Sequence, residues 1–103
     1  MAGEFMFAPG GASVEFSNGL VLSMINNKLS SVRIGTTIGR ENDYRSKIVE
    51  VAIFKNGEFM TSKVLRYTHF FERISGETIL CNPNDVVSIM NIVSSWYGST
   101  NEV

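Results

Sequence analysis

The sequence has little of the chemistry on which disulfides, metal sites and membrane anchors depend. It holds one cysteine and one histidine in 103 residues. A single cysteine excludes an intramolecular disulfide, and one Cys with one His does not make a zinc site. No apolar run approaches the roughly 20 residues of a membrane-spanning helix, and no secretory signal peptide is recognisable. We therefore expect a reducing, cytoplasmic setting, with no metal, no other cofactor and no membrane contact.

Net charge is almost absent as well. Nine Lys and Arg stand against ten Asp and Glu, so the formal charge is −1 and no global field attracts nucleic acid or a membrane surface. With 44% hydrophobic and 18% charged residues, the chain can bury a modest core. We interpret residues 1–5 as an expression-tag remnant, 6–98 as a single α+β domain and 99–103 as a frayed tail.

Two Asn-Gly dipeptides between apolar runs predict two β-hairpins. Asn56-Gly57 lies inside the segment 46–65, and a type I′ turn there needs positive φ at both residues. A two-residue loop would place Phe54 opposite Phe59, a favourable cross-strand aromatic pair. The same register pairs Lys55 with Glu58, Ile53 with Met60, Glu50 with Lys63 and Val49 with Val64.

The other dipeptide, Asn18-Gly19, predicts a hairpin over 12–25. A two-residue loop would pair Phe16 with Val21, Glu15 with Leu22 and Val14 with Ser23. Between the hairpins, 26–45 is polar, with a brief β-like run at 31–34, and is either a functional or a mobile connection. Residues 7–11 are predicted as loop and 77–80 as a short strand. The segment 65–74 fits a helical turn or a strand, with a helical turn favoured.

The clearest helix signal lies near the C-terminus. Asn82 is a candidate N-cap, Pro83 suits the first helical position and Asp85 the third, and Gly98 would end the helix. Its predicted apolar face comprises Val86, Val87, Ile89, Met90, Val93, Trp96 and Tyr97. These elements predict an α+β fold, in which an antiparallel sheet of four to five strands has one face packed by this helix.

Few residues in the sequence are candidates for catalysis, and Cys81 and His69 are the main ones. Cys81 precedes the proposed helix N-cap, a position that can stabilise a thiolate. It also follows Ile79-Leu80, and a free cysteine in apolar surroundings is usually a small buried side chain. His69 lies among aromatics and is expected to be packed or exposed at the surface. We predict no catalytic residue and no enzymatic activity.

The apolar surplus favours protein contacts. The central hairpin is apolar on both faces, whereas one helix covers only one face. The second face is then covered by 67–74, by a second copy or by a partner. We predict a non-enzymatic interaction module that forms a homo-oligomer, with a dimer favoured, or binds a host protein. The predicted contact residues are Phe54, Phe59, Ile48 and Leu65.

The alternative is weak nucleic-acid binding through a basic loop at 28–47. That loop has five Lys or Arg against two acidic residues, and arginines beside an aromatic can bind single strands. A solvated loop on a near-neutral protein is the favoured interpretation, so nucleic acid is an unlikely partner. The candidate residues are Arg33, Arg40, Tyr44, Arg45 and Lys47.

Three segments carry a family resemblance: FSNGLVLS at 16–23, VEVAIFKNGEF at 49–59 and NPNDVVSIM at 82–90, before Trp96. Together they resemble small uncharacterised accessory proteins of tailed bacteriophages, including phages of marine cyanobacteria. Leu20 departs from the aromatic usual in that family. The resemblance implies a host-cell cytoplasmic setting and carries over no catalytic or binding residue.

Overall fold

The computed structural model describes residues 3–8, 10–26, 31–35 and 43–97. Eight strands, two α-helices and one 3-10 helix follow one another along this part of the chain. In chain order they are β1 (Glu4–Ala8), β2 (Gly11–Glu15), β3 (Val21–Asn26), β4 (Ser31–Gly35), β5 (Asp43–Ser46), β6 (Val49–Lys55), β7 (Glu58–Phe59), α1 (Thr61–Val64), η1 (Phe71–Arg73), β8 (Ile79–Cys81) and α2 (Pro83–Ser94).

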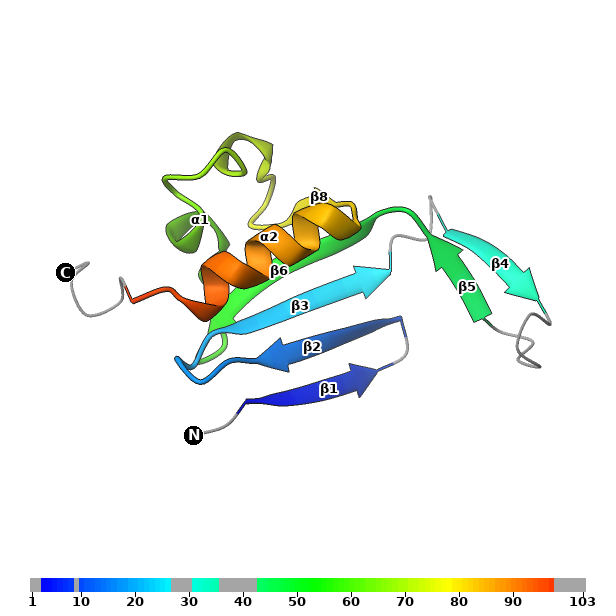
Figure 1. Cartoon of the computed structure of the whole chain (residues 1–103), viewed down its shortest axis with the longest axis horizontal. Helices are drawn as coiled ribbons and strands as arrows, with labels where there is room; N and C mark the ends of the chain where they lie inside the picture. The colour runs from blue at the N-terminus through cyan, green and yellow to red at the C-terminus, as the bar shows by residue number, and fades with distance from the viewer. Residues whose placement is uncertain (1–2, 9, 27–30, 36–42, 98–103) are drawn as a thin grey trace.

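The main sheet is antiparallel and has six strands. Its order is β1-β2-β3-β6-β7, and β8 pairs with β6 on the same edge as β7. Helix α2 lies across this sheet, while β4 and β5 pair only with each other and extend beyond its end (Figure 1). The predicted α+β class, with a C-terminal helix packed on an antiparallel sheet, is confirmed.

The Asn56-Gly57 turn forms as predicted. Both residues have positive φ, +53° and +81°, which is the requirement of a type I′ turn. Phe54 then pairs with Phe59, and their ring centroids lie 4.7 Å apart. The local turn chemistry therefore fixes the register at this end of the hairpin.

Farther from the turn the predicted register is wrong, because the chain leaves the ladder at Thr61. The fully buried Thr61 hydroxyl accepts a hydrogen bond from the Ile53 N–H at 2.9 Å, in place of a strand carbonyl. The chain then turns into α1, and β8 takes the edge of β6 at Val49–Val51. As a result, neither Glu50 with Lys63 nor Val49 with Val64 is a cross-strand pair.

The hairpin at Asn18-Gly19 is shifted by one residue from the prediction. Glu15 pairs with Val21, and the connection is a three-residue loop, 17–19, in which Gly19 has φ +88°. The Phe16 carbonyl accepts from the Gly19 N–H at 2.9 Å, and the Phe16 N–H donates to the Leu20 carbonyl at 2.9 Å. This is the pattern of a turn followed by a left-handed bulge residue. A one-residue shift changes the cross-strand neighbour of every residue.

Asn18 accounts for the longer loop. Its side-chain amide donates to the carbonyls of Val93 (2.7 Å) and Trp96 (3.2 Å), and its oxygen accepts from the Leu20 N–H at 3.1 Å. The side chain thus ties the hairpin loop to the C-terminal end of α2. Val93 lies in the last turn of α2, whose carbonyls lack the usual partner one turn later, and Trp96 follows the end of the helix.

The N-terminal segment is more regular than predicted. Phe7 and Ala8 lie in β1 and Gly11 begins β2, so 7–11 is not loop throughout. A Cβ at Gly11 would lie 2.6 Å from the Met24 carbonyl oxygen, which explains the glycine at this strand position. Glu4 and Phe5, within the predicted tag remnant, pair with β2.

Helix α2 begins as predicted and ends earlier. The side chains and backbone N–H groups of Asn82 and Asp85 form a reciprocal capping box, with Pro83 at the first helical position. The helix ends at Ser94, before Trp96 and Tyr97, and the predicted stop at Gly98 lies outside the described residues. Val87 and Tyr97 are exposed, so the predicted apolar face was too broad.

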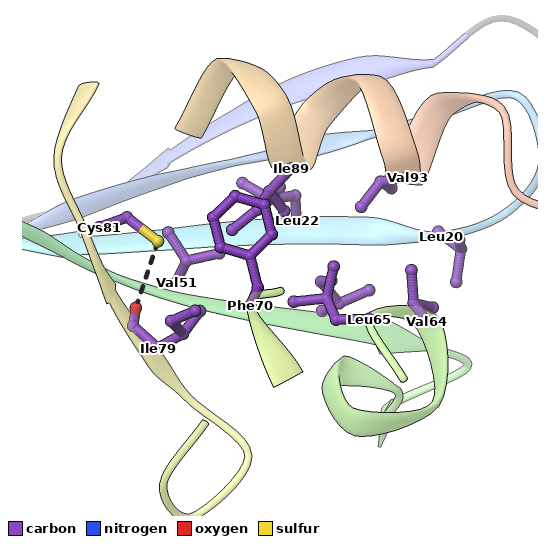
Figure 2. Close-up of a cluster of buried hydrophobic side chains, with 11 residues drawn as sticks. Leu20, Leu22, Val51, Val64, Leu65, Phe70, Ile79, Cys81, Ile89 and Val93 are labelled. Atoms are coloured by element: carbon purple, nitrogen blue, oxygen red, sulfur yellow. Dashed lines mark hydrogen bonds between the residues drawn. The ribbon is translucent and has the colours of Figure 1, made fainter. Parts of the chain in front are cut away.

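The core lies between the sheet and α2. Segment 65–74, predicted as a helical turn or short helix, consists of turns followed by η1, and its Leu65 and Phe70 are fully buried on the α2 side. Predicted strand 77–80 is shifted to β8 (Ile79–Cys81). The buried cluster, most of which Figure 2 labels, comprises Leu20, Leu22, Val51, Ile53, Val64, Leu65, Phe70, Ile79, Cys81, Ile89 and Val93.

Candidate interaction surface

The sheet face opposite α2 is the candidate site, and we call it the open face. Side chains alternate between the two faces of a strand, so the residues that neighbour the core residues of each strand belong to it. Its described members are Glu4, Met6, Ala8, Gly11, Ser13, Glu15, Val21, Ser23, Ile25, Glu50, Ala52, Phe54, Phe59 and Leu80.

The described chain leaves this face without a covering element. Of the candidates to cover it, segment 67–74 lies on the other side, since Phe70 joins the same buried cluster as Ile89 and Val93 of α2. Arg73 of η1 forms an ion pair with Asp85 at the start of α2, which places η1 on that side as well.

Large apolar side chains are exposed at the margins of the open face. Met6, Ile25, Leu80 and Phe59 are between 41% and 52% exposed. Between them, Ser13, Ser23 and Ala52 are aligned directly across β2, β3 and β6. Small side chains flanked by exposed apolar ones give a surface that another protein segment can contact closely.

The open face is also acidic. Glu15 lies on β2 and Glu50 on β6, while Glu4, which pairs with Glu15, belongs to the predicted tag remnant. None of the strand positions described on this face is Lys or Arg. Arg73 reaches its β8 edge, where the guanidinium donates to the Leu80 carbonyl at 2.7 Å and to Asp85 at 2.8 Å.

The predicted contact residues are only partly brought together. Phe54 and Phe59 lie together on the open face, with their ring centroids 4.7 Å apart and their planes tilted by 33°, and their role as contact residues stays a prediction. Ile48 is half-buried and lines a hollow of about 250 Å³ with Met24 and Val86, away from the two phenylalanines. Leu65 is wrong as a contact residue because it is fully buried in the core. The break in the ladder at Thr61 is the cause.

Sequence reasoning missed three of the exposed apolar side chains on the open face. Met6 was missed because β1 was not predicted, although the alternation in EFMFA is a strand signal. Ile25 was placed in a hairpin with the wrong register, and Leu80 in a strand predicted to begin two residues too early and to end one residue too early. These three side chains lie on the same exposed face only because β1, β3 and β8, which are distant in the sequence, belong to one sheet.

The basic loop contains a two-stranded ribbon. Val32 pairs with Arg45 and Arg33 pairs with Tyr44, so the β-like run at 31–34 is confirmed as part of β4. The ribbon lies beyond the end of the main sheet (Figure 1). Lys47 is exposed just before β6, and Lys28 and Arg40 lie outside the described residues.

A second exposed aromatic pair lies on the α2 side of the sheet edge. Phe5 and Phe7 of β1 are exposed and their ring centroids lie 6.4 Å apart. Because Phe5 belongs to the predicted tag remnant, this pair is a weaker candidate than the open face.

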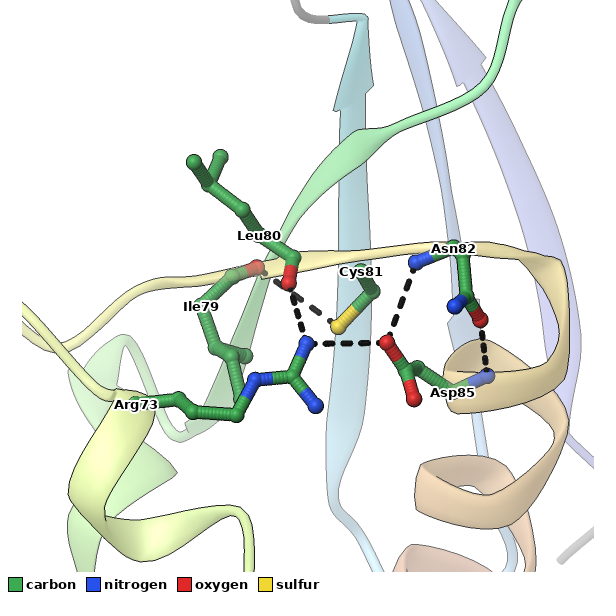
Figure 3. Close-up of polar contacts among 6 residues, drawn as sticks. All are labelled: Arg73, Ile79, Leu80, Cys81, Asn82 and Asp85. Carbon is green, nitrogen blue, oxygen red and sulfur yellow. Dashed lines mark hydrogen bonds and ion pairs between the residues drawn. The ribbon is translucent and has the colours of Figure 1, made fainter.

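The Cys81 region is a structural cluster (Figure 3). Burial raises the pKa of the Cys81 thiol to about 11, so the thiol is protonated at neutral pH. The Arg73 guanidinium lowers the pKa of the nearby Asp85 carboxyl, whose Oδ2 also accepts from the Asn82 N–H at 3.2 Å. His69 is exposed, with its ring 4.1 Å from that of Phe70.

Within the described ranges, no three His, Cys, Asp or Glu residues are grouped so that they could hold a metal ion. In the same part of the chain, no helix combines the length and the apolarity that crossing a bilayer requires.

No known protein family, curated protein or solved structure matches this chain. The resemblance to phage accessory proteins therefore stays a prediction.

Proposed function

We propose that this protein is a small, non-enzymatic interaction module that acts through its open face, in a homo-oligomer or with a protein partner. The observation that carries the proposal is the exposure of Met6, Ile25, Phe59 and Leu80 on one sheet face. Folding leaves this apolar surface in water, and association would remove it.

The tilted aromatic pair of Phe54 and Phe59 is the strongest contact candidate. Aromatic side chains are enriched among the residues that dominate binding energy. Phe59 is 52% exposed, and its ring centroid lies 4.7 Å from that of Phe54 on the neighbouring strand. A homodimer would bury the same residues on both subunits if they lie near a two-fold axis.

Phe59→Ser tests the proposal. We expect sedimentation velocity to show an assembly for the wild-type chain and a weaker one, or a monomer, for the variant. Tyr67→Ser is the matched control, since Tyr67 is 89% exposed and lies outside the sheet. Equal effects of the two substitutions, or none from Phe59→Ser on a wild-type assembly, would exclude the open face as the contact.

We place the protein in the cytoplasm, of an infected host cell if it is phage-encoded. A free, buried thiol at Cys81 suits a reducing compartment.

Nucleic-acid binding through the β4–β5 ribbon is the second candidate. The supporting observation is that Arg33, Tyr44 and Arg45 occupy a two-stranded ribbon outside the main sheet. A two-stranded ribbon fits the DNA major groove, and basic contacts to phosphates make binding strongly salt-dependent. Binding of a labelled oligonucleotide that weakens with salt and on Arg45→Ala would support it, while salt-insensitive or absent binding would exclude it.

A further inference from the structure

We propose that strand β1 pairs with β1 of a second copy of this chain, edge to edge and antiparallel, so that two main sheets join into one. This contact goes beyond the proposed function, because it uses the backbone of the sheet edge, whereas the open face would bind through side chains. The inference follows from the form of the two sheet edges, from the direction of the β1 backbone groups and from the self-complementarity of the strand.

The two edges of the main sheet differ. Strand β1 is a regular edge of five residues, and in the described part of the chain nothing pairs with its outer side (Figure 1). The opposite edge consists of β7 and β8, of two and three residues, and the Leu80 carbonyl accepts from the Arg73 guanidinium at 2.7 Å. Short strands and basic side chains protect an edge from pairing. Because β1 is longer and contains no Lys, Arg or Pro, it is the edge open to another strand.

Hydrogen bonds at the two ends of β2 fix the direction of its backbone groups. The Phe16 N–H donates to the Leu20 carbonyl at 2.9 Å, and the Gly10 carbonyl accepts from the Asn26 N–H at 2.7 Å. The even-numbered residues of β2 therefore point their N–H and C=O groups at β3. Since these groups alternate in direction along a strand, the odd-numbered residues of β2 point theirs at β1.

The same alternation shows which groups of β1 face outward. The odd-numbered residues of β2 pair with Glu4, Met6 and Ala8, so these three direct their backbone groups at β2. The N–H and C=O groups of Phe5 and Phe7 then point to the free side of the strand. The edge thus presents donors and acceptors to an incoming strand at two positions.

One register pairs these groups along the whole strand. With a two-fold axis at Met6, that residue lies opposite its own copy, Phe5 lies opposite Phe7 of the second copy, and Glu4 lies opposite Ala8. All five residues of β1 are then paired, whereas a shift of the axis along the strand leaves some of them outside the ladder. Each pair of Phe5 with Phe7 exchanges two N–H···O=C hydrogen bonds.

The side chains agree with this register. Phe5 and Phe7 are 71% and 80% exposed on the α2 side, where the four rings of two copies would form cross-strand aromatic pairs. The carboxylate of Glu4 lies opposite a small apolar residue, Ala8, and not opposite its own copy. Glu4 and Phe5 belong to the predicted tag remnant, but they continue the β1–β2 ladder without a break. The inference is made for the chain with residues 1–5 present.

Single cysteines test the register. Opposite residues of a non-hydrogen-bonded pair have Cα atoms about 4.5 Å apart, which suits a disulfide, whereas diagonal neighbours are about 7–8 Å apart, which does not. Met6 lies opposite its own copy in the proposed dimer, and Phe7 is diagonal to its own copy. With a mild oxidant we expect Met6→Cys to give a disulfide-linked dimer and Phe7→Cys to give much less. Cys81 is buried and common to both chains.

A proline tests the edge hydrogen bonds. Phe7→Pro removes an N–H that points to the free side, and Phe7→Val keeps it, while both remove the aromatic ring and spare the bonds to β2. We expect the dissociation constant of the Phe7→Pro dimer to be at least about tenfold higher than that of Phe7→Val, because each subunit loses one edge hydrogen bond. Sedimentation velocity measures the assembly, and circular dichroism confirms that both variants are folded.

The outcomes separate the edge from the open face. Preferential cross-linking of Met6→Cys that is abolished by adding Phe7→Pro supports edge pairing. Equal cross-linking of the two cysteine variants, or equal dissociation constants for Phe7→Pro and Phe7→Val, overturns it. An assembly that Phe59→Ser weakens and Phe7→Pro does not also overturns edge pairing, and it leaves the proposed function in place. A monomeric wild-type chain contradicts both edge pairing and the homo-oligomer form of the proposed function.

Discussion

The two Asn-Gly turns look alike in the sequence and should respond differently to the same substitution, Asn→Gly. At Asn56 the backbone has φ +53°, a conformation that glycine adopts without strain, so Asn56→Gly should change stability by less than about 1 kcal/mol. At Asn18 the residue acts through its side chain, which joins the hairpin loop to the end of α2. Glycine removes that side chain.

The magnitude follows from the three hydrogen bonds that Asn18 makes, at 2.7, 3.2 and 3.1 Å. A hydrogen bond contributes about 0.5–1.5 kcal/mol net, so Asn18→Gly should lower the free energy of unfolding by about 2–3 kcal/mol. At about 4–8 °C per kcal/mol, the midpoint of thermal unfolding should fall by roughly 10–20 °C.

Urea unfolding followed by circular dichroism, with both variants at one protein concentration, measures the difference. Equal losses at the two positions would mean that the Asn18 side chain contributes nothing to stability beyond its turn, contrary to the prediction. A larger loss of stability at Asn56 would also contradict the prediction.

Three further predictions concern the core, the thiol and the helix cap. Leu65→Ala should lower the free energy of unfolding by about 2–5 kcal/mol because Leu65 is fully buried, and the mass of the folded protein should not change; a mild loss with altered mass would contradict its core position. Cys81 should react slowly with a thiol reagent at pH 7 and completely in denaturant, since burial raises its pKa to about 11; fast native reaction would contradict its burial. The lowered pKa of Asp85 contributes stability that is present above the unfolded-state value of about 3.9 and is lost as pH falls through the lower folded-state value. Asp85→Asn should therefore destabilise the protein at pH 7 and much less at pH 2, as measured by urea unfolding at each pH, and equal effects would be inconsistent with the ion pair to Arg73.

Elements fixed by neighbouring residues could be predicted from the sequence. The Asn56-Gly57 turn and the capping box at Asn82 and Asp85 each depend on a span of a few residues, and both form as expected. The α+β class followed from the same local signals.

What depended on distant segments could not be predicted. The Asn18 side chain bonds to Val93, 75 residues away, and this tie accompanies the shifted register of the first hairpin. Thr61 ends the central ladder through a hydroxyl, and β8 pairs with the part of β6 that Val64 and Lys63 were expected to cover.

The candidate site was predicted in part for the same reason. The pairing of Phe54 and Phe59 is local, and it was found. Leu65 was assigned to the surface because the hairpin was extended past Thr61, where the chain turns toward the core. The apolar margin formed by Met6, Ile25 and Leu80 becomes visible only when β1, β3 and β8 are placed in one sheet.

The most direct test of the account is the solution mass of the wild-type chain, measured by light scattering over a range of protein concentrations at low salt. Self-association through the open face predicts a mass of about twice the single-chain value of 11.4 kDa, falling toward that value on dilution. A mass that stays at 11.4 kDa at every concentration would contradict self-association through this face.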